Sequence, residues 1–482
     1  MLRADLKPMV IKEAYMSYIL PFAYQQKYLQ ELGDLLQNKG YTFFNLDNNQ
    51  LEDEYYGNQV KVLNEELDQY FLPYVQQKLF PKNFDMYGFH RFSKRIRKSF
   101  KLEVNGFSYP FKVESVDVFF CPFGIAFLTM RTELTSKEKE LSDVLNFMNY
   151  MRVAEPKLKE EKGATIVTTE GKSYENGHTF LFDYLCPDIK DYIIDNQKLR
   201  GYFGSLPYFE DERMFVTGFL FSGDNEELDP TSLYRMGHLD GRDPQGKPYL
   251  STTNKDYIDR FYQEHIHDRW APYTYTVTTE HAHIKVSRNP IEESERQLSQ
   301  YMGTHYYNLI LHYFYRVMLL RLSFEYSDLE WNKDEDYIRD LIELITIFSS
   351  RYYFGEVSAR TEGKELSKIF LRTFHIDDLY AEVKGTLHEL YQNQENIAAE
   401  RQNQLLFMLT VFTVISGIVG MNLVIEDWKG QTGWSAIQNY NFMEWITLLT
   451  AAVGILLSIS LFVVTIVRWL RLKIIKKLHK HF

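Results

Sequence analysis

The sequence has little cysteine, and its last part has no proline. Only Cys121 and Cys186 are cysteines, too few for a disulfide framework, which favours a reducing compartment. All 14 prolines lie at or before Pro290, so no proline interrupts a helix after that residue. The N-terminus lacks a basic segment followed by an apolar one, so no cleaved signal peptide is predicted.

The sequence also lacks the motifs of several function classes. It has no glycine-rich phosphate loop that ends in Lys-Ser or Lys-Thr, so ATP-driven pumping is not expected. No catalytic Ser-His-Asp or Cys-His set can be argued from the spacing, and the chain is predicted not to be an enzyme. The net charge is −11, with a basic C-terminal tail. An acidic body of this kind argues against nucleic acid as a partner and suits contact with cations.

Short β-rich segments alternate with helical ones before residue 290. Segments 115–130, 213–221 and 273–287 are rich in aromatic and β-branched residues, which is typical of strands, whereas 136–152 has a helical pattern. After residue 290 the pattern is helical, because apolar residues of 336–353 recur with a period of 3.6. The sequence therefore predicts an α/β domain followed by a helical region.

Two apolar segments near the C-terminus are predicted to be transmembrane helices. Residues 405–425 and 445–467 contain no charge, and each is long enough to span a bilayer. Lysines and arginines follow the second segment, so the positive-inside rule predicts an inner (cytoplasmic) membrane protein with both termini cytosolic. A third apolar segment, 306–320, is shorter and carries a polar stripe, which favours a helix buried in a helical bundle.

The first of these segments continues a longer helical one. No proline interrupts 377–425, so a continuous stalk helix is expected, and a break near Gly385 is the alternative. Counting back from Asn422 in steps of three and four gives a small or polar face: Gly420, Gly417, Thr413, Thr410, Leu406, Asn403, Ala399 and Asn396. Such a face fits a helix that lines a narrow wet axis. Tight helix packing through small residues is the alternative, and it explains the glycines better than the threonines.

A Gly-Met-Asn triplet stands at 420–422, followed by a short linker, a last apolar segment and a lysine-rich tail. Together these features resemble the CorA family of divalent-cation channels, which have two transmembrane helices. The resemblance is specific over about 375–482 and only architectural before residue 290. It implies a homopentamer in the lipid bilayer, with the 377–425 helices around one axial pore.

The resemblance also implies roles for particular residues. Gly420, Met421 and Asn422 match the signature and would form the selectivity filter, and the pore would be lined by Asn396, Ala399, Asn403, Leu406, Thr410, Thr413 and Gly417. Amide carbonyls suit a hydrated Mg²⁺, which gives up water reluctantly. Mg²⁺ is therefore the expected ion, both transported and regulatory, and other divalent cations are alternatives.

The sequence departs from the family after the triplet. The usual Met-Pro-Glu-Leu loop is missing, and Glu426 and Asp427 supply the outward negative charge that would attract cations. Mg²⁺ sensing in the cytosolic part would use acidic residues near the helical region: Glu356, Glu362, Asp377 and Asp378. The predicted function is thus a passive Mg²⁺-type channel gated by ligand binding to the cytosolic domain.

A basic run interrupts the acidic N-terminal part. "RFSKRIRK" at 91–98 contains the candidate anion ligands Arg91, Lys94, Arg95, Arg97 and Lys98, although such a run is also typical of a solvated helix face. Large divergent CorA-like proteins are associated with type III CRISPR defence. The alternative function is therefore a nucleotide-gated membrane effector of antiviral defence, and a two-span anchor for a binding domain ranks last.

The predicted organisation divides the chain into six parts. They are a cytosolic α/β domain (1–290), a cytosolic helical region (291–376), a stalk helix continuing into the first transmembrane helix (377–425), an outward-facing loop (426–444), the second transmembrane helix (445–467) and a basic cytosolic tail (468–482). The whole is expected to be a CorA-like homopentameric funnel.

Overall fold

The computed structural model divides the chain into two compact units. They are Met1–Thr386 and Leu387–Phe482. The structure describes residues 6–57, 60–85, 87–136, 139–156, 164–194, 213–223, 227–289, 291–327, 335–421, 440–443, 445, 446, 448–450, 452–454, 456 and 460.

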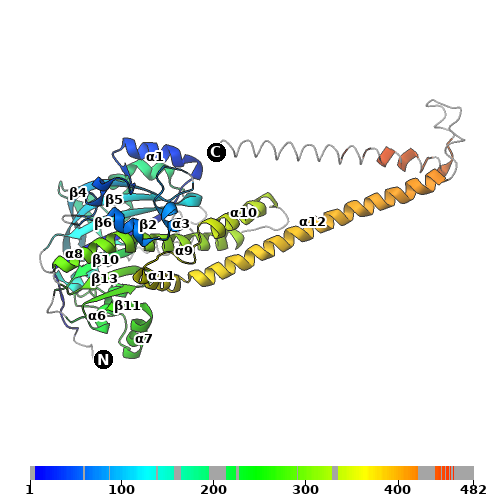
Figure 1. The fold of residues 1–482 in the computed structure, drawn as a ribbon. Helices are drawn as coiled ribbons and strands as arrows, with labels where there is room; N and C mark the ends of the chain where they lie inside the picture. The colour runs from blue at the N-terminus through cyan, green and yellow to red at the C-terminus, as the bar shows by residue number, and fades with distance from the viewer. Residues whose placement is uncertain are drawn as a thin grey trace. The chain divides into compact units, whose positions relative to one another are not determined.

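The first unit is built on one large mixed sheet of 11 described strands (Figure 1). Its strands are β2 Glu13–Ala23, β3 Thr42–Phe43, β4 His90–Val104, β5 Phe107–Phe120, β6 Ile125–Leu134, β8 Thr165–Thr168, β9 Ser173–Tyr174, β10 Phe215–Phe221, β11 Ile266–Trp270, β12 Thr274–Thr278 and β13 Ala282–Ser287. Their order is β11-β12-β13-β10-β2-β6-β5-β4-β8-β9, with β3 beside β4. In the described part of the sheet, β10 and β13 are parallel and the other neighbours are antiparallel. A separate antiparallel pair joins β1 Val10–Ile11 to β7 Lys139–Glu140.

Helices surround this sheet and fill the connections. They are α1 Leu29–Asn38, α2 Asn64–Tyr70, α3 Pro73–Leu79, α4 Leu141–Met151, α5 Gly177–Phe180, α6 Pro230–His238, α7 Lys255–His265, α8 Ile291–Gln300, α9 Tyr306–Ser327, α10 Glu335–Arg351 and α11 Thr361–Thr373. Helix α12 Ile376–Met421 begins in the first unit and continues into the second. Short 3-10 turns are η1 Gln26–Tyr28, η2 Asn49–Glu52, η3 Pro122–Gly124 and η5 Pro187–Tyr192, and π-helical turns are η4 Leu181–Leu185 and η8 Tyr301–His305.

The two faces of the sheet pack against different helices. Successive side chains of a strand point to opposite faces, so Tyr18 of β2 meets Phe147 of α4 at 6.3 Å between ring centroids. On the other face Phe119 and Phe127 meet Tyr307 and Tyr313 of α9, at 5.9 and 5.4 Å. Because both faces are covered, the central strands are buried on both sides.

Helix α9 lies in the middle of the core. Fourteen of its residues are buried, and they point in every direction around the helix axis. Its polar residues Asn308 and His312 are buried along with the apolar ones, so this helix belongs to the protein core. Helix α9 contains the segment 306–320, which the sequence predicts to be a buried helix, so that prediction is confirmed.

A charged cluster joins the sheet to α9, and we call Arg91, Asp117 and Arg131 the arginine–aspartate cluster. Asp117 accepts from Arg91 Nη2 at 3.3 Å and from Arg131 Nε and Nη2 at 3.1 and 2.9 Å. It also accepts from Ser93 Oγ at 2.7 Å. All three members of the cluster are buried. Burial by itself raises the pKa of Asp117, but the two guanidiniums and the Ser93 hydroxyl outweigh it and lower the pKa below its ordinary value.

The structure corrects the predicted membrane architecture. Where the sequence predicts a helix over 377–425, the structure has α12, which has 46 residues and ends where the described residues end. In the described part of the chain, no helix has both the length and the apolar character needed to cross a bilayer. The prediction of a stalk with two transmembrane helices was wrong, and so were the inner-membrane location and the channel features that depend on these spans.

Some of the residues behind that prediction lie outside the described part. They are residues 422–439, residue 444, much of the second predicted span 445–467 and the whole tail 468–482. The sheet domain also differs from the expected α/β pattern, because most of its strands are antiparallel neighbours rather than parallel strands joined by helices.

Asp117→Asn is expected to destabilise the first unit strongly. The amide cannot neutralise two buried guanidiniums, so the free energy of unfolding should fall by about 3–5 kcal/mol. Ser93→Ala, which removes one hydrogen bond to the same carboxylate, should cost only about 1 kcal/mol. Urea denaturation of both variants measures the difference. Equal losses would show that the carboxylate charge does not hold the cluster together.

His312 of α9 should make stability fall in acid. Burial lowers the pKa of His312 to about 4, below its ordinary value of about 6.5. Unfolding therefore takes up a proton between these values, so stability is full above about pH 6.5 and declines as the pH falls. His312→Phe should reduce the slope of unfolding free energy against pH by about 1 kcal/mol per unit between pH 4.5 and 5.5. An unchanged slope would mean that His312 is charged in the folded state.

Candidate anion-binding pocket

A charged pocket opens between strand β4 and two described stretches, residues 50–57 and 60–61, which together we call the pocket loop. Its volume is about 430 Å³, within the range of roughly 300–1,000 Å³ that is usual for small-molecule sites. It is lined by Gln50, Asp53, Glu54, Gly57, Val60, Lys61, Arg95 and Arg97. Three cationic side chains and two carboxylates thus face the same space.

A bulge in β4 positions the two arginines. Arg95 lies opposite Ser115 of β5, whereas Lys98 lies opposite Val113, so β4 holds an extra residue between them. Arg97, inside this bulge, has φ of 49°, a conformation that costs a non-glycine residue roughly 1–2 kcal/mol. Bulges redirect side chains beside active sites, and backbone strain of this kind gathers at functional sites.

The arginines of the pocket are only loosely paired. Arg95 Nη1 lies 3.8 Å from Glu54 Oε1, and Arg97 Nε lies 3.9 Å from Glu114 Oε2. Both distances are longer than a hydrogen bond. The Arg95 side chain is 44% exposed and the Arg97 side chain is 36% exposed. The buried Glu114 is held more closely by Lys112 Nζ, at 2.5 Å. Within the described residues neither guanidinium makes a hydrogen bond, so their N–H groups are open there to an incoming acceptor.

Buried contacts fix the pocket loop against the sheet. Ser115 Oγ donates to the carbonyl of Tyr55 at 2.7 Å, and Arg91 Nη1 donates to Tyr56 Oη at 2.7 Å. The Tyr56 ring lies 5.2 Å from the Arg91 guanidinium and 5.0 Å from that of Arg131. Because one loop residue contacts both arginines of the arginine–aspartate cluster, the loop is held in place before any ligand arrives.

The structure divides the basic run that the sequence singles out. The run forms strand β4, not a helix, and Arg91 is buried in the arginine–aspartate cluster. Lys94 lies over the Tyr41 ring at 4.9 Å, and Lys98 donates to Tyr184 Oη at 3.2 Å, away from the pocket. Of the five predicted residues, Arg95 and Arg97 line the pocket.

The predicted regulatory acidic residues lie in separate surroundings. Lys364 pairs with Glu356 at 3.4 Å, and His305 Nε2 lies 3.5 Å from Glu362. Asp377 accepts from Tyr353 Oη at 3.3 Å, whereas Asp378 lies 3.8 Å from His375. Across the described residues, no group of three or more His, Cys, Asp or Glu side chains could hold a metal ion. A regulatory Mg²⁺ stays a prediction.

The predicted pore residues Asn396, Ala399, Asn403, Leu406, Thr410, Thr413 and Gly417 all lie on α12. The hydroxyls of Thr410 and Thr413 donate to the carbonyls of Leu406 and Leu409 of the same helix, at 2.8 and 2.7 Å. Helical threonines commonly satisfy their hydroxyls in this way, so these two need no wet axis.

The predicted filter stands where the described part of α12 ends. The α12 backbone includes Gly420 and Met421, while Asn422, Glu426 and Asp427 lie outside the described residues. The structure contains one chain, so the pentamer stays a prediction.

Comparison of this chain with protein-family models, with curated proteins and with solved structures found no match in any of the three. The resemblance to the CorA family therefore stays a prediction that rests on the triplet at 420–422 together with the linker, the last apolar segment and the lysine-rich tail.

Replacing Arg97 should reveal the backbone strain in the bulge. Arg97→Gly and Arg97→Ala both remove the guanidinium, but only alanine keeps a Cβ at positive φ, so the glycine variant should be more stable by about 1 kcal/mol. Urea denaturation measures the difference between the two variants.

Arg95 supplies the matched control for this comparison. It lies outside the positive-φ positions of the described chain, so Arg95→Gly should be less stable than Arg95→Ala by about 0.5–1 kcal/mol. The same order of stability at both positions would contradict a strained Arg97.

Proposed function

We propose that the first unit is a receptor for a small phosphorylated molecule of the nucleotide class, bound in the pocket between the pocket loop and β4. The observation that carries the proposal is the strained bulge, which holds Arg95 and Arg97 in one pocket, where their N–H groups make no hydrogen bond to any described residue. The proposal keeps the nucleotide ligand of the alternative sequence prediction and leaves out its membrane part.

Phosphate is the anion that these side chains suit best. A guanidinium presents several N–H donors in a planar fork that matches two phosphate oxygens. Lys61 adds a third cation on the opposite wall, although its Nζ lies 3.0 Å from Glu52 Oε2. Two open forks and one ammonium at the rim favour a ligand with more than one negative charge.

The rest of the lining favours a nucleotide over a bare inorganic anion. Asp53 and Glu54 are acceptors beside the arginines, and a bare phosphate would be repelled by them. Ribose hydroxyls and base amino groups can donate to carboxylates. Gln50 can both donate and accept, and Val60 offers apolar contact to a base. A ligand with phosphate at one end and hydrogen-bond donors at the other satisfies both kinds of group.

AMP and ATP should each raise the melting temperature of the full chain by a few degrees when their concentration far exceeds Kd. Arg95→Gln/Arg97→Gln should lose this rise. Lys98→Gln is the matched control, since it removes a neighbouring cation that lies outside the pocket, and it should retain the rise. Differential scanning fluorimetry provides the measurement.

Glu54→Gln separates the two ends of the ligand. It should weaken stabilisation by AMP, because one carboxylate oxygen that accepts from the ligand is lost. It should strengthen stabilisation by pyrophosphate, because a negative charge that repels the anion is lost. No rise with either nucleotide in the wild type, or an equal rise in the double variant, would overturn the proposal.

A further inference from the structure

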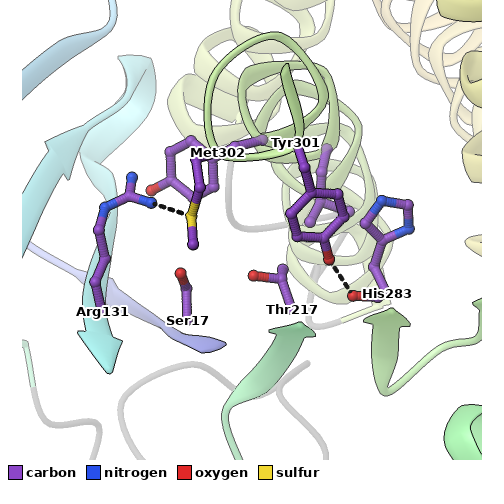
Figure 2. A pocket seen from close by; sticks show the side chains of 8 residues that line it. Ser17, Arg131, Thr217, His283, Tyr301 and Met302 are labelled. Carbon is purple, nitrogen blue, oxygen red and sulfur yellow. Dashed lines mark hydrogen bonds between the residues drawn. The ribbon is translucent and has the colours of Figure 1, made fainter. Parts of the chain in front are cut away.

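Charged side chains continue along the helical face of the sheet beyond the π-helical turn η8. Figure 2 shows Arg131 of β6 pointing toward this turn. Alternate side chains of a strand share a face, so Glu133 lies on the same face of β6, and Lys112 of β5 is opposite it. Ser115, opposite Arg131, binds the carbonyl of Tyr55 in the pocket loop. Lys112 therefore lies on the face of the sheet that the pocket loop covers.

A bulge brings a buried carboxylate next to Arg97. The bulge in β4 contains Arg97, and the residue of β5 opposite it is Glu114. Glu114 also interrupts the register between β5 and β6. A Cβ added to Gly57, which lines the pocket, would lie 3.8 Å from Glu114 Cγ. Glu114 is thus directly behind the wall of the pocket.

Two cations share the Glu114 carboxylate. The Glu114 side chain is only 4% exposed, and a buried carboxylate is costly without a charged partner. Lys112 Nζ lies 2.5 Å from Oε1, whereas Arg97 Nε lies 3.9 Å from Oε2. Among the described residues these two are the cations within 4 Å of Glu114. The closer contact of Lys112 leaves Arg97 available on the pocket side.

The surroundings of Lys112 are otherwise acidic. Burial and the nearby Glu114 raise the pKa of Glu133, and Lys112 acts on that pKa in the opposite direction. Lys112 itself does not line the pocket. If Lys112 lost its charge, Glu133 would still repel Glu114. Arg97 would then be the one remaining cation within 4 Å of Glu114 in the described part of the chain.

We propose that Lys112 is a positioning residue for the nucleotide pocket. It holds the buried Glu114 carboxylate, so that Arg97 can donate to the phosphate of the ligand instead of to Glu114. This inference rests on the proposed function, which uses Arg97 but gives no role to Lys112. Lys112 acts on the ligand through Arg97, from behind the wall of the pocket.

Lys112→Met removes the charge and keeps the length of the side chain. The Kd of the full chain for AMP, measured by isothermal titration calorimetry, should rise at least about tenfold, the usual effect of losing one charge-assisted hydrogen bond. Lys98→Met is the matched control, because Lys98 is next to Arg97 in sequence but contacts Tyr184 rather than Glu114. Its Kd should stay close to that of the wild type. Equal weakening in both variants would mean that only net charge matters, and would overturn the proposal.

Rescue by a second change separates positioning from a structural role. Glu114→Gln added to Lys112→Met should restore AMP binding, because the group that draws Arg97 away is then neutral. Lys112→Arg should retain binding, and Glu114→Gln alone should bind AMP at least as tightly as the wild type. A loss that persists in the double variant, or weaker binding in Glu114→Gln alone, would contradict the role of Lys112.

A crystal structure of Lys112→Met provides a measurement that needs no ligand. Arg97 should move to within hydrogen-bond distance of Glu114, and an unmoved Arg97 would overturn the proposal. A wild-type chain that does not bind AMP would refute the nucleotide site and this role with it. Normal AMP binding by Lys112→Met would refute the role of Lys112 and leave the nucleotide site intact.

Discussion

The single carboxylate of Asp117 holds two buried guanidiniums at the centre of the first unit. Each arginine is costly to bury alone, and each gains hydrogen bonds and charge attraction from the same carboxylate. Arg91 comes from β4 and Arg131 from β6, so the charge links the two neighbours of β5 across the strand between them. The aromatic residues of α9 pack over the same groups, with Tyr306 4.5 Å from the Arg131 guanidinium.

The charged pocket inherits its shape from that cluster. Tyr56 anchors the pocket loop, because its ring lies 5.2 Å from the Arg91 guanidinium and 5.0 Å from that of Arg131. Arg95, four residues along β4 from buried Arg91, lines the pocket beside the same loop. Strand β4 therefore contributes to both the core and the pocket. Its Arg91 is paired with Asp117 in the core, whereas its Arg95 and Arg97 are loosely paired at the pocket. A binding site built this way is rigid on one wall, because that wall is the edge of the core.

Sequence patterns located the regular elements better than the site. Segments 213–221 and 273–287, rich in aromatic and β-branched residues, contain β10 and the β12–β13 pair. Strand β4 was missed because its basic residues look solvated, and the burial of Arg91 depends on Asp117, which is distant in sequence. No local sequence pattern marks Asp53, Glu54 and Lys61 as part of a site, because tertiary contacts alone bring the pocket loop to β4. The membrane prediction used the lengths of uncharged segments and a triplet, and the described helices do not have the required apolar length.

The strand order has a consequence for synthesis. Strand β2, near the N-terminus, pairs with β6 on one edge and with β10 on the other. About 80 residues separate the end of β6 from the start of β10, so at 5–20 residues per second the second edge of β2 stays open for roughly 4–16 s on the ribosome. This edge is long and mostly apolar, and exposed strand edges of this type pair with other chains and cause aggregation. The yield of folded protein in a cell should therefore depend on how that interval is protected, independently of how stable the finished sheet is.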